Sequence, residues 1–278
     1  MKLCNIQVGG ETHLAAVSQG QVRDLSAAGL GLSMNEVIAG AGRDEIAVLL
    51  DAGLPPVERP VFANVTGPVG KLVCIGLNYR SHAAGISMKI PERPIIFSKF
   101  ADALAPAGAQ VELPPWEQSY DYEAELVIVM GREAWNVSEE DAMGCVFGYT
   151  CGNDLSCRDA QMRSGQWLIG KTMPGFAPCG PYIVTADACD PDAGLRVRSF
   201  VNGELRQDGT TADMIFSCAA LISYASRYLR LMPGDLIFTG TPSGVALEKG
   251  DAVRQWLRPG DRVDVEIEGI GTLSNVMI

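Results

Sequence analysis

The chain has 278 residues, of which 47% are hydrophobic and 20% charged, the profile of a globular protein with one large domain or a small and a large one. Its formal net charge of −11 argues against nucleic acid or an anionic membrane as a partner. The first residues lack the apolar core of a signal peptide, and no apolar run approaches the length of a membrane span. We therefore expect a cytoplasmic protein whose eight scattered cysteines, without zinc-site spacing, are reduced.

The beginning of the chain has the pattern of a small separate unit. Residues 2–26 predict short strands joined by glycine turns, and residues 33–52 predict a helical region. Residues 54–70 are rich in proline and glycine, which is typical of a boundary. We therefore expect a small N-terminal α/β domain over residues 1–66 and a larger domain over residues 67–278.

The larger domain is predicted to be mostly strands. Two helices are expected, at residues 138–145 and 213–231, and a glycine or a Pro-Gly pair lies near the end of each. This pattern favours a mainly β (α+β) fold over a doubly wound sheet. The predicted strands are residues 71–77, 94–100, 124–130, 148–154, 181–186, 195–203, 235–240 and 261–278.

Residues 165–172, GQWLIGKT, match the spacing of a phosphate-binding loop. That loop needs a preceding strand and a following helix, so that backbone amides point at phosphate. Here the preceding residues are polar, Trp167 adds bulk to the turn, and Pro174 prevents a long helix. We therefore expect no nucleotide site, and Lys171 needs another explanation.

Alternating carboxylates precede a strongly apolar run in residues 120–131, YDYEAELVIVMG. On a strand, Asp121, Glu123 and Glu125 share one face, and like charges beside a core are unfavourable unless something neutralises them. A solvated strand end is the common explanation, but a second predicted strand ends in Asp154. Two carboxylates from one strand and a third from its neighbour are hard oxygen ligands, which favour Mg²⁺, Mn²⁺ or Ca²⁺ over zinc or copper.

Six motifs occur in a consistent order: GLNYRSHAAG, IIFSKF, DYEAELVIVMG, GYTCGNDLSCRDAQ, GQWLIGKTMPGFAPCGP and GDLIFTGTPSGV. Over residues 70–278 the chain resembles the fumarylacetoacetate hydrolase (FAH) family. The resemblance implies a distorted β-roll core around a divalent metal, usually Mg²⁺, and commonly a homodimer. It also implies a 2-oxo acid substrate, whose carboxylate and keto oxygens chelate the metal. The N-terminal domain resembles one that many members carry.

The resemblance also implies roles for individual residues. Asp121 is the carboxylate that the resemblance leaves without a role. Of the two histidines, His13 lies in the N-terminal strand region and is expected at the surface. The implied metal ligands are Glu123, Glu125 and Asp154. The implied catalytic residues are His82, Lys171 and Gln161, and the implied substrate-binding residues are Arg158, Thr241, Lys99 and Tyr79.

The chain departs from the family at one position. Many members read NYxxHxxE, in which the glutamate pairs with the histidine on a mobile lid, whereas here Gly85 stands three residues after His82. A carboxylate partner orients the ring and raises its basicity, so a lone His82 is expected to be a poorer base. Glu92 is an alternative partner from the same stretch, and residues 82–94 are expected to form a lid.

Three functions are compatible with these residues. The first is hydrolysis of the C–C bond in an acylpyruvate-type 2,4-dioxo acid, such as fumarylpyruvate, in aromatic or sugar acid catabolism. His82 then deprotonates water, while Lys171 and Gln161 stabilise the oxyanion. The second is isomerase, tautomerase or decarboxylase chemistry on a related 2-oxo acid, which needs no attacking water. The third is a metal-dependent 2-oxo acid binding protein, against which the intact set of site residues argues.

We expect Glu123→Ala to abolish turnover, because it removes one metal ligand, and to stabilise the metal-free protein by relieving like-charge repulsion. Steady-state rates and denaturant unfolding measure the two effects. Full activity of the wild-type protein in excess chelator, after exhaustive dialysis, would contradict the metal requirement.

If the enzyme is a hydrolase that uses the family's dyad, Gly85→Glu is expected to raise its hydrolytic rate. General-base assistance is typically worth about 10²- to 10⁴-fold, so a partial gain is measurable as pyruvate release. A wild-type protein and a Gly85→Glu variant that both release no pyruvate would contradict the hydrolase hypothesis.

Overall fold

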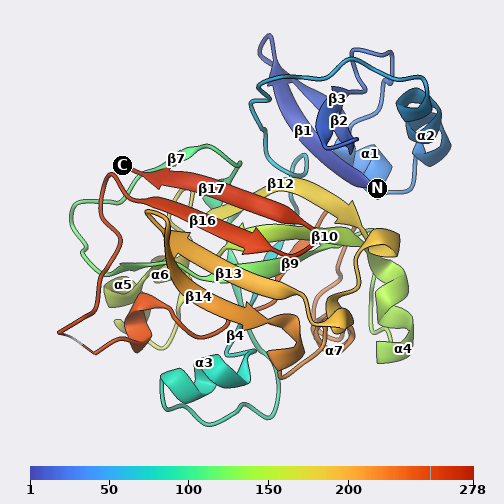
Figure 1. The fold of residues 1–278 in the computed structure, drawn as a ribbon. Helices are drawn as coiled ribbons and strands as arrows, with labels where there is room; N and C mark the ends of the chain where they lie inside the picture. Colours follow the sequence, from blue (N-terminus) through green and yellow to red (C-terminus); the bar gives the residue numbers. More distant parts are fainter. Residues whose placement is uncertain (251) are drawn as a thin grey trace.

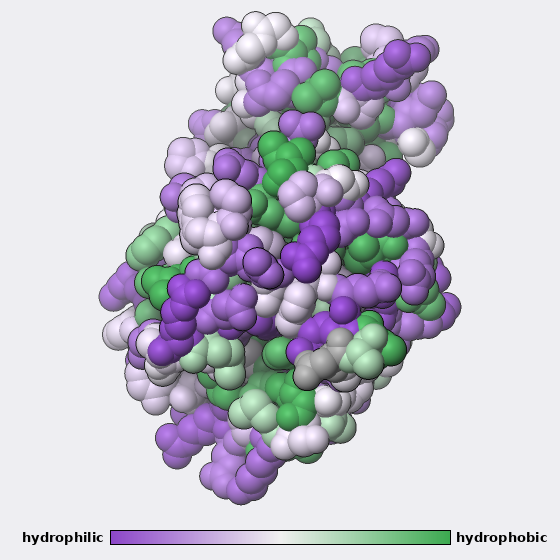
Figure 2. Space-filling model, turned by 90° about the vertical axis from the view of Figure 1, so that its left-hand side faces the viewer, coloured by the Kyte–Doolittle hydropathy of each residue, from purple (hydrophilic) through white to green (hydrophobic). Residues whose placement is uncertain are grey.

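The computed structural model describes residues 1–250 and 252–278. Figure 1 shows a small N-terminal unit above a larger body, and Figure 2 shows the same two lobes, with apolar residues in small groups among polar ones on this face. The N-terminal unit is an antiparallel meander followed by two helices. Its elements are β1 (Lys2–Val8), β2 (Glu11–Ser18), β3 (Gln21–Asp24), α1 (Met34–Ile38) and α2 (Arg43–Asp51). The predicted helical region is therefore two short helices, the first capped by Ser33.

The larger body is built on a long sheet with the strand order β3-β2-β1-β12-β10-β9-β15-β4-β5. β1 pairs antiparallel with β12, so this sheet runs through both lobes, across the boundary that the sequence predicts near residue 66. That domain boundary stays a prediction. The remaining strands of the sheet are β4 (Leu72–Gly76), β5 (Ile95–Lys99), β9 (Ala124–Met130), β10 (Val146–Asn153), β12 (Ala177–Thr185) and β15 (Leu236–Phe238).

A second sheet, with the order β14-β13-β16-β17-β7, lies in front of the first in Figure 1. Its strands are β7 (Gln110–Val111), β13 (Arg196–Val201), β14 (Glu204–Thr210), β16 (Arg262–Ile267) and β17 (Gly271–Met277). Three short strands complete the β-structure: β6 (Leu104–Ala105) beside β12, and the pair β8 (Tyr120–Asp121) and β11 (Ser156–Cys157).

β9 is buried on both faces, which explains why its sequence is continuously apolar. Leu126 and Ile128 belong to the core cluster that also contains Val265 of the second sheet. Val127 belongs to the cluster on the opposite face, which reaches Leu3 of the N-terminal unit. β9 is therefore fixed from both sides, and so are the residues at its beginning.

The helices are short and lie around the sheets. The predicted helix at 138–145 is present as α4 (Glu139–Ala142) with the 3₁₀ turn η2 (Met143–Cys145), whereas the one at 213–231 is limited to α7 (Cys218–Ser226), capped by Ser217. Three further helices were not expected from the sequence: α3 (Arg80–Gly85), α5 (Arg158–Met162) and α6 (Leu168–Lys171). The other 3₁₀ turns are η1 (Ala101–Ala103), η3 (Ala186–Ala188), η4 (Pro191–Ala193), η5 (Thr211–Asp213) and η6 (Ala246–Glu248).

The predicted fold class is confirmed: the protein is mainly β, with small helices. All eight cysteines are free thiols, and seven of them are buried. In the described part of the chain, no helix has the length and apolar character needed to cross a membrane.

Candidate active site

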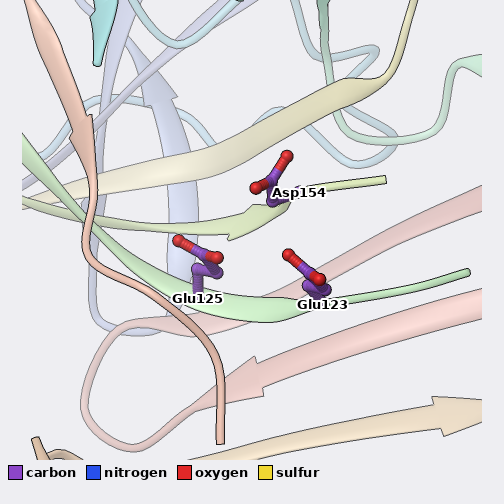
Figure 3. A group of neighbouring side chains, drawn as sticks. All are labelled: Glu123, Glu125 and Asp154. Atoms are coloured by element: carbon purple, nitrogen blue, oxygen red, sulfur yellow. The ribbon is translucent and has the colours of Figure 1, made fainter. Parts of the chain in front are cut away.

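Three carboxylates meet where β9 begins and β10 ends (Figure 3). The antiparallel pairing places Gly152 opposite Glu125, and the backbone N–H of Asp154 donates to the carbonyl of Glu123 at 2.9 Å. One ligand oxygen from each of Glu123, Glu125 and Asp154 lies within 4.8 Å of the others, and all three residues are buried. The structure therefore brings together the three metal ligands that the resemblance implies.

Basic side chains already neutralise two of the three carboxylates. Lys171 Nζ lies 2.6 Å from Glu123 Oε2 and 2.8 Å from Asp154 Oδ2, and Lys99 forms an ion pair with Asp154. Arg158 Nη2 lies 2.6 Å from Glu123 Oε1. Burial alone would raise the pKa of Glu123, but Lys171 and Arg158 outweigh it and lower this pKa to about 2. Glu123 is therefore ionised and well compensated.

Glu125 is the carboxylate that remains without a basic partner among the described residues. Its Oε2 accepts the backbone N–H of Gly240 at 2.8 Å. Burial raises the pKa of Glu125 well above its ordinary value, and the charges of Asp154 and Glu123 raise it further. In this part of the structure, four buried carboxylates face three buried cations: Asp121, Glu123, Glu125 and Asp154 against Lys99, Arg158 and Lys171. When Glu125 is ionised, the set therefore has one excess negative charge, and this charge and the all-oxygen donors fit a hard divalent cation.

A cavity of about 270 Å³ opens beside these carboxylates. Its volume is near the lower end for small-molecule pockets, which are typically about 300–1,000 Å³. The implied site residues that line it are His82, Glu123, Glu125, Arg158, Gln161, Lys171 and Thr241. The polar end of the cavity therefore combines chelating oxygens, cations and a histidine.

Two implied substrate-binding residues do not line this cavity. Tyr79 is fully buried in the hydrophobic core. Lys99 is buried behind Asp154, and its ammonium also donates to the carbonyl oxygens of Leu155 (3.0 Å) and Phe176. In the described structure, Lys99 therefore supports a carboxylate of the site, and direct contact of either residue with substrate stays a prediction.

His82 has a carboxylate partner that the sequence analysis missed. Its Nδ1 lies 2.5 Å from Oε1 of Glu248, and Oε2 of Glu248 accepts the N–H of Gly244 at 2.7 Å. The His82 and Glu248 side chains are only 9% and 8% exposed. The expectation of a lone histidine is therefore wrong. The partner comes from η6, 166 residues further along the chain, and no spacing rule connects the two residues.

The glycine at position 85 has a physical reason. A Cβ atom built on Gly85 would lie 2.6 Å from the Glu248 carboxyl carbon, closer than real side chains approach one another. Gly85 thus leaves the space that Glu248 fills. Glu92 is exposed and lies 3.6 Å from Lys89, so it is not the partner of His82 in this structure.

Asp121, left without a role in the sequence analysis, connects the two ends of the site. Its Oδ1 accepts the N–H of Ala246 at 2.8 Å, and its Oδ2 accepts the N–H of Leu247 at 3.0 Å. The same Oδ2 accepts from Nε of Arg158 at 2.9 Å. Asp121 therefore fixes the η6 turn, which carries Glu248, against the guanidinium that contacts the metal-ligand triad.

A second missed residue, Gln207, holds Thr241. Gln207 Nε2 donates to Thr241 Oγ1 at 2.8 Å, and that hydroxyl donates to the carbonyl of Ala124 at 2.9 Å. Gln161 is also oriented, because its Oε1 accepts from Nη1 of Arg158 at 3.0 Å. The polar side chains of the site are therefore held in place by the protein.

The remaining expectations concern residues beside the site. The segment before residues 165–172 includes α5 and is not a strand, and Lys171 points to carboxylates, so the structure agrees with the absence of a nucleotide loop. His13 is half-buried and lies 2.8 Å from Asp24 in the N-terminal unit. Of the expected lid, residues 82–85 are helical, and Ile86 and Met88 line the cavity. Closure of this segment stays a prediction.

Comparison with known proteins identifies the family. The model for the fumarylacetoacetate (FAA) hydrolase C-terminal domain matches residues 71–278. The chain belongs to this family. Its members include enzymes, and the buried acidic triad of this chain is of the kind that binds a divalent metal.

Three relatives within the FAH family show the range of activities. "Oxaloacetate tautomerase FAHD2A, mitochondrial" from Homo sapiens is 39% identical over 249 residues, 89% of this chain and 78% of that protein. The fumarylacetoacetate hydrolase of Exiguobacterium antarcticum has a TM-score of 0.90 at 32% identity, covering 100% and 99% of the two chains. Maleylpyruvate hydrolase from Sphingobium sp. SYK-6, solved with manganese(II) and pyruvate, has a TM-score of 0.82 at 27% identity, with 100% and 99% covered.

The pKa of Glu125 leads to a prediction about stability. The folded protein holds the proton of the Glu125 carboxyl group more tightly than the unfolded chain does, because glutamates in the unfolded chain have a pKa near 4.5. The contribution of this proton to stability is therefore complete below that value and is lost as the pH rises through the raised pKa of the folded protein, so the metal-free protein should lose stability as the pH rises above about 5. Glu125→Gln keeps the neutral form and should reduce this slope, as measured by urea unfolding at each pH.

The matched control is Glu11→Gln, which changes an exposed glutamate on β2 and should leave the pH slope unchanged. Equal pH slopes for the wild-type protein and Glu125→Gln would show that Glu125 is ionised without a metal.

The structure also revises the stability expected of Glu123→Ala. Because Lys171 and Arg158 compensate Glu123, its removal leaves these two cations unbalanced and should destabilise the metal-free protein.

Proposed function

We propose that this protein is a divalent-metal-dependent enzyme that transfers a proton on a 2-oxo acid, interconverting its keto and enol forms. One observation carries the proposal: a single cavity is lined by Glu123 and Glu125 of the chelating triad and by His82, the histidine that is paired with the buried Glu248. A 2-oxo acid offers two adjacent oxygens for chelation and an acidic C–H next to them. The relative named as an oxaloacetate tautomerase supports this reaction type.

The metal end of the cavity stabilises negative charge. Glu123, Glu125 and Asp154 would hold a divalent cation, which we propose is Mg²⁺ or Mn²⁺, and this cation would supply Lewis acidity towards the 2-oxo group. Lys171 is buried, and its pKa is raised because Asp154 and Glu123 outweigh the effect of burial, so it remains a fixed positive charge. Such a preorganised cation stabilises the charge that develops on the substrate oxygens without reorganising water.

The other end of the cavity handles the proton. Glu248 accepts a hydrogen bond from Nδ1–H of His82, which leaves Nε2 of the neutral ring as the acceptor. His82 lines the cavity, so its ring can take a proton from the carbon beside the 2-oxo group and return it to the oxygen or the carbon of the resulting enolate. Glu248 stabilises the imidazolium that forms between the two transfers.

Hydrolysis of an acylpyruvate is the second candidate, because the same dyad can deprotonate a water molecule. The pairing of His82 with Glu248 removes the objection that this base lacks a carboxylate. The similarity to maleylpyruvate hydrolase also favours it. Release of pyruvate from fumarylpyruvate or acetylpyruvate distinguishes hydrolysis from tautomerisation. The homodimer and the cytoplasmic location expected from the sequence remain proposals.

The dyad is tested by Glu248→Gln, which keeps the size of the side chain and removes its charge. We expect kcat to fall by roughly 10²-fold or more, because the imidazolium loses the carboxylate that stabilises it. The matched control is Glu92→Gln, which removes the exposed glutamate of the expected lid. The assay follows keto–enol exchange of a series of 2-oxo acids, with oxaloacetate among them, and pyruvate release in parallel, with Mg²⁺ or Mn²⁺. Wild-type rates in Glu248→Gln would contradict the proposed base. If no 2-oxo acid exchanges faster with the protein than with metal alone, the proposed function fails.

The structure also reverses the outcome expected of Gly85→Glu. The new side chain would be forced into Glu248, so the single variant should lose activity, whichever reaction is catalysed. Combining Gly85→Glu with Glu248→Gly moves the carboxylate to the position where many family members carry it and should restore part of the rate. A double variant no more active than Glu248→Gly alone would contradict this exchange of positions.

A further inference from the structure

The cavity changes character away from the metal-ligand triad. Its remaining wall is apolar and comes from five separate segments: β4 and the residue after it, the residues that follow α3, β5, the region of α5 and α6, and η6. The residues on which the argument depends are Leu77, Ile86, Met88, Phe97, Met162 and Trp167.

An aromatic pair forms the most ordered part of this wall. The rings of Phe97 and Trp167 meet edge to face, with centroids 5.4 Å apart and planes at 68°. A Cβ atom on Gly76 would lie 2.5 Å from Cζ3 of Trp167, so the glycine in β4 leaves the space in which the indole lies. Lys171 Nζ lies 5.2 Å from the Phe97 ring centroid, which places the aromatic pair directly beside the charged end.

Among the described residues that line the cavity, every lysine and arginine already has carboxylate partners. Arg158 donates through Nε, Nη1 and Nη2 to Asp121, Gln161 and Glu123. Lys171 donates to Glu123 and Asp154. A second carboxylate on a substrate would therefore lie against apolar side chains without a cation, which is unfavourable in a buried site.

We propose that the substrate is a 2-oxo acid with an uncharged, apolar tail, either alkyl or aryl, which packs against Phe97 and Trp167. This proposal rests on the proposed function for the 2-oxo acid end and adds the chemistry of the other end. It separates this chain from its relative named for oxaloacetate, a compact acid with two carboxylates. Ile86 and Met88, from the end of α3 and the loop after it, add apolar surface for the same tail.

The test is a substrate series with the Mn²⁺-loaded protein. Pyruvate, 2-oxobutanoate, 2-oxopentanoate and phenylpyruvate are compared with oxaloacetate and 2-oxoglutarate, with deuterium exchange at C3 as the activity and competition against oxalate as the binding measurement. Each methylene that enters the apolar wall should improve kcat/KM, by up to about tenfold. 2-Oxoglutarate should bind more weakly than 2-oxopentanoate, which has the same number of carbons and no second carboxylate.

Two variants locate the effect. Trp167→Ala should lower kcat/KM for 2-oxopentanoate and phenylpyruvate more than it lowers kcat/KM for pyruvate. Met88→Arg adds a cation at a position that is half exposed, and it should favour 2-oxoglutarate over 2-oxopentanoate. Val48→Arg, on exposed α2 surface, is the control for the added charge and should leave the ratio unchanged.

The outcomes separate the two proposals. If neither oxalate nor any 2-oxo acid binds in the presence of Mn²⁺, the proposed function fails. If the 2-oxo acids bind but dicarboxylates are preferred, and Trp167→Ala changes all substrates equally, the apolar tail is wrong while the function stands. A Met88→Arg variant with the same substrate ratio as Val48→Arg would also count against the tail.

Discussion

The repulsion among buried carboxylates at the start of β9 is the constraint around which this site is organised. Glu123, Glu125 and Asp154 are held close together because β9 and β10 pair in fixed register and β9 is buried on both faces. The chain cannot separate these charges without breaking its core, so each charge must be neutralised where it lies. Lys171, Arg158 and Lys99 do so for two of the three carboxylates, and Glu125 is left for the divalent cation that we propose.

The same constraint connects the metal end of the cavity to the proton-transfer end. Asp121 contacts Arg158 and also accepts two backbone N–H groups from the turn that carries Glu248. A single carboxylate thus orients a guanidinium at the triad and the partner of His82. Because Asp121 contacts both parts, the position of the turn that carries Glu248 relative to Arg158 is set by the fold. This arrangement suits a reaction in which charge and proton move on adjacent atoms of one small molecule.

The sequence predicted those features that are encoded over short distances. The apolar run after Glu125 indicated a buried strand, and a carboxylate at the end of a second strand indicated a hard-metal site, because neighbouring strands align their ends. Glu248 and Gln207 could not be predicted in this way, because their partners lie 166 and 34 residues away and no periodicity links them. The helices α3, α5 and α6 have four to six residues, too few for an amphipathic pattern to be recognised. For Tyr79 and Lys99, the motif gave the position in the chain but not the direction of the side chain.

The most direct measurement is calorimetric titration of Mn²⁺ into the metal-free protein, in buffers of different ionisation enthalpy. The account predicts one site per chain and, at a pH below the raised pKa of Glu125, the release of a proton on binding, because Glu125 must ionise to become a ligand. It also predicts that Glu125→Gln weakens binding and releases fewer protons. An unchanged affinity and unchanged proton release in Glu125→Gln would contradict the view that this uncompensated carboxylate creates the metal site.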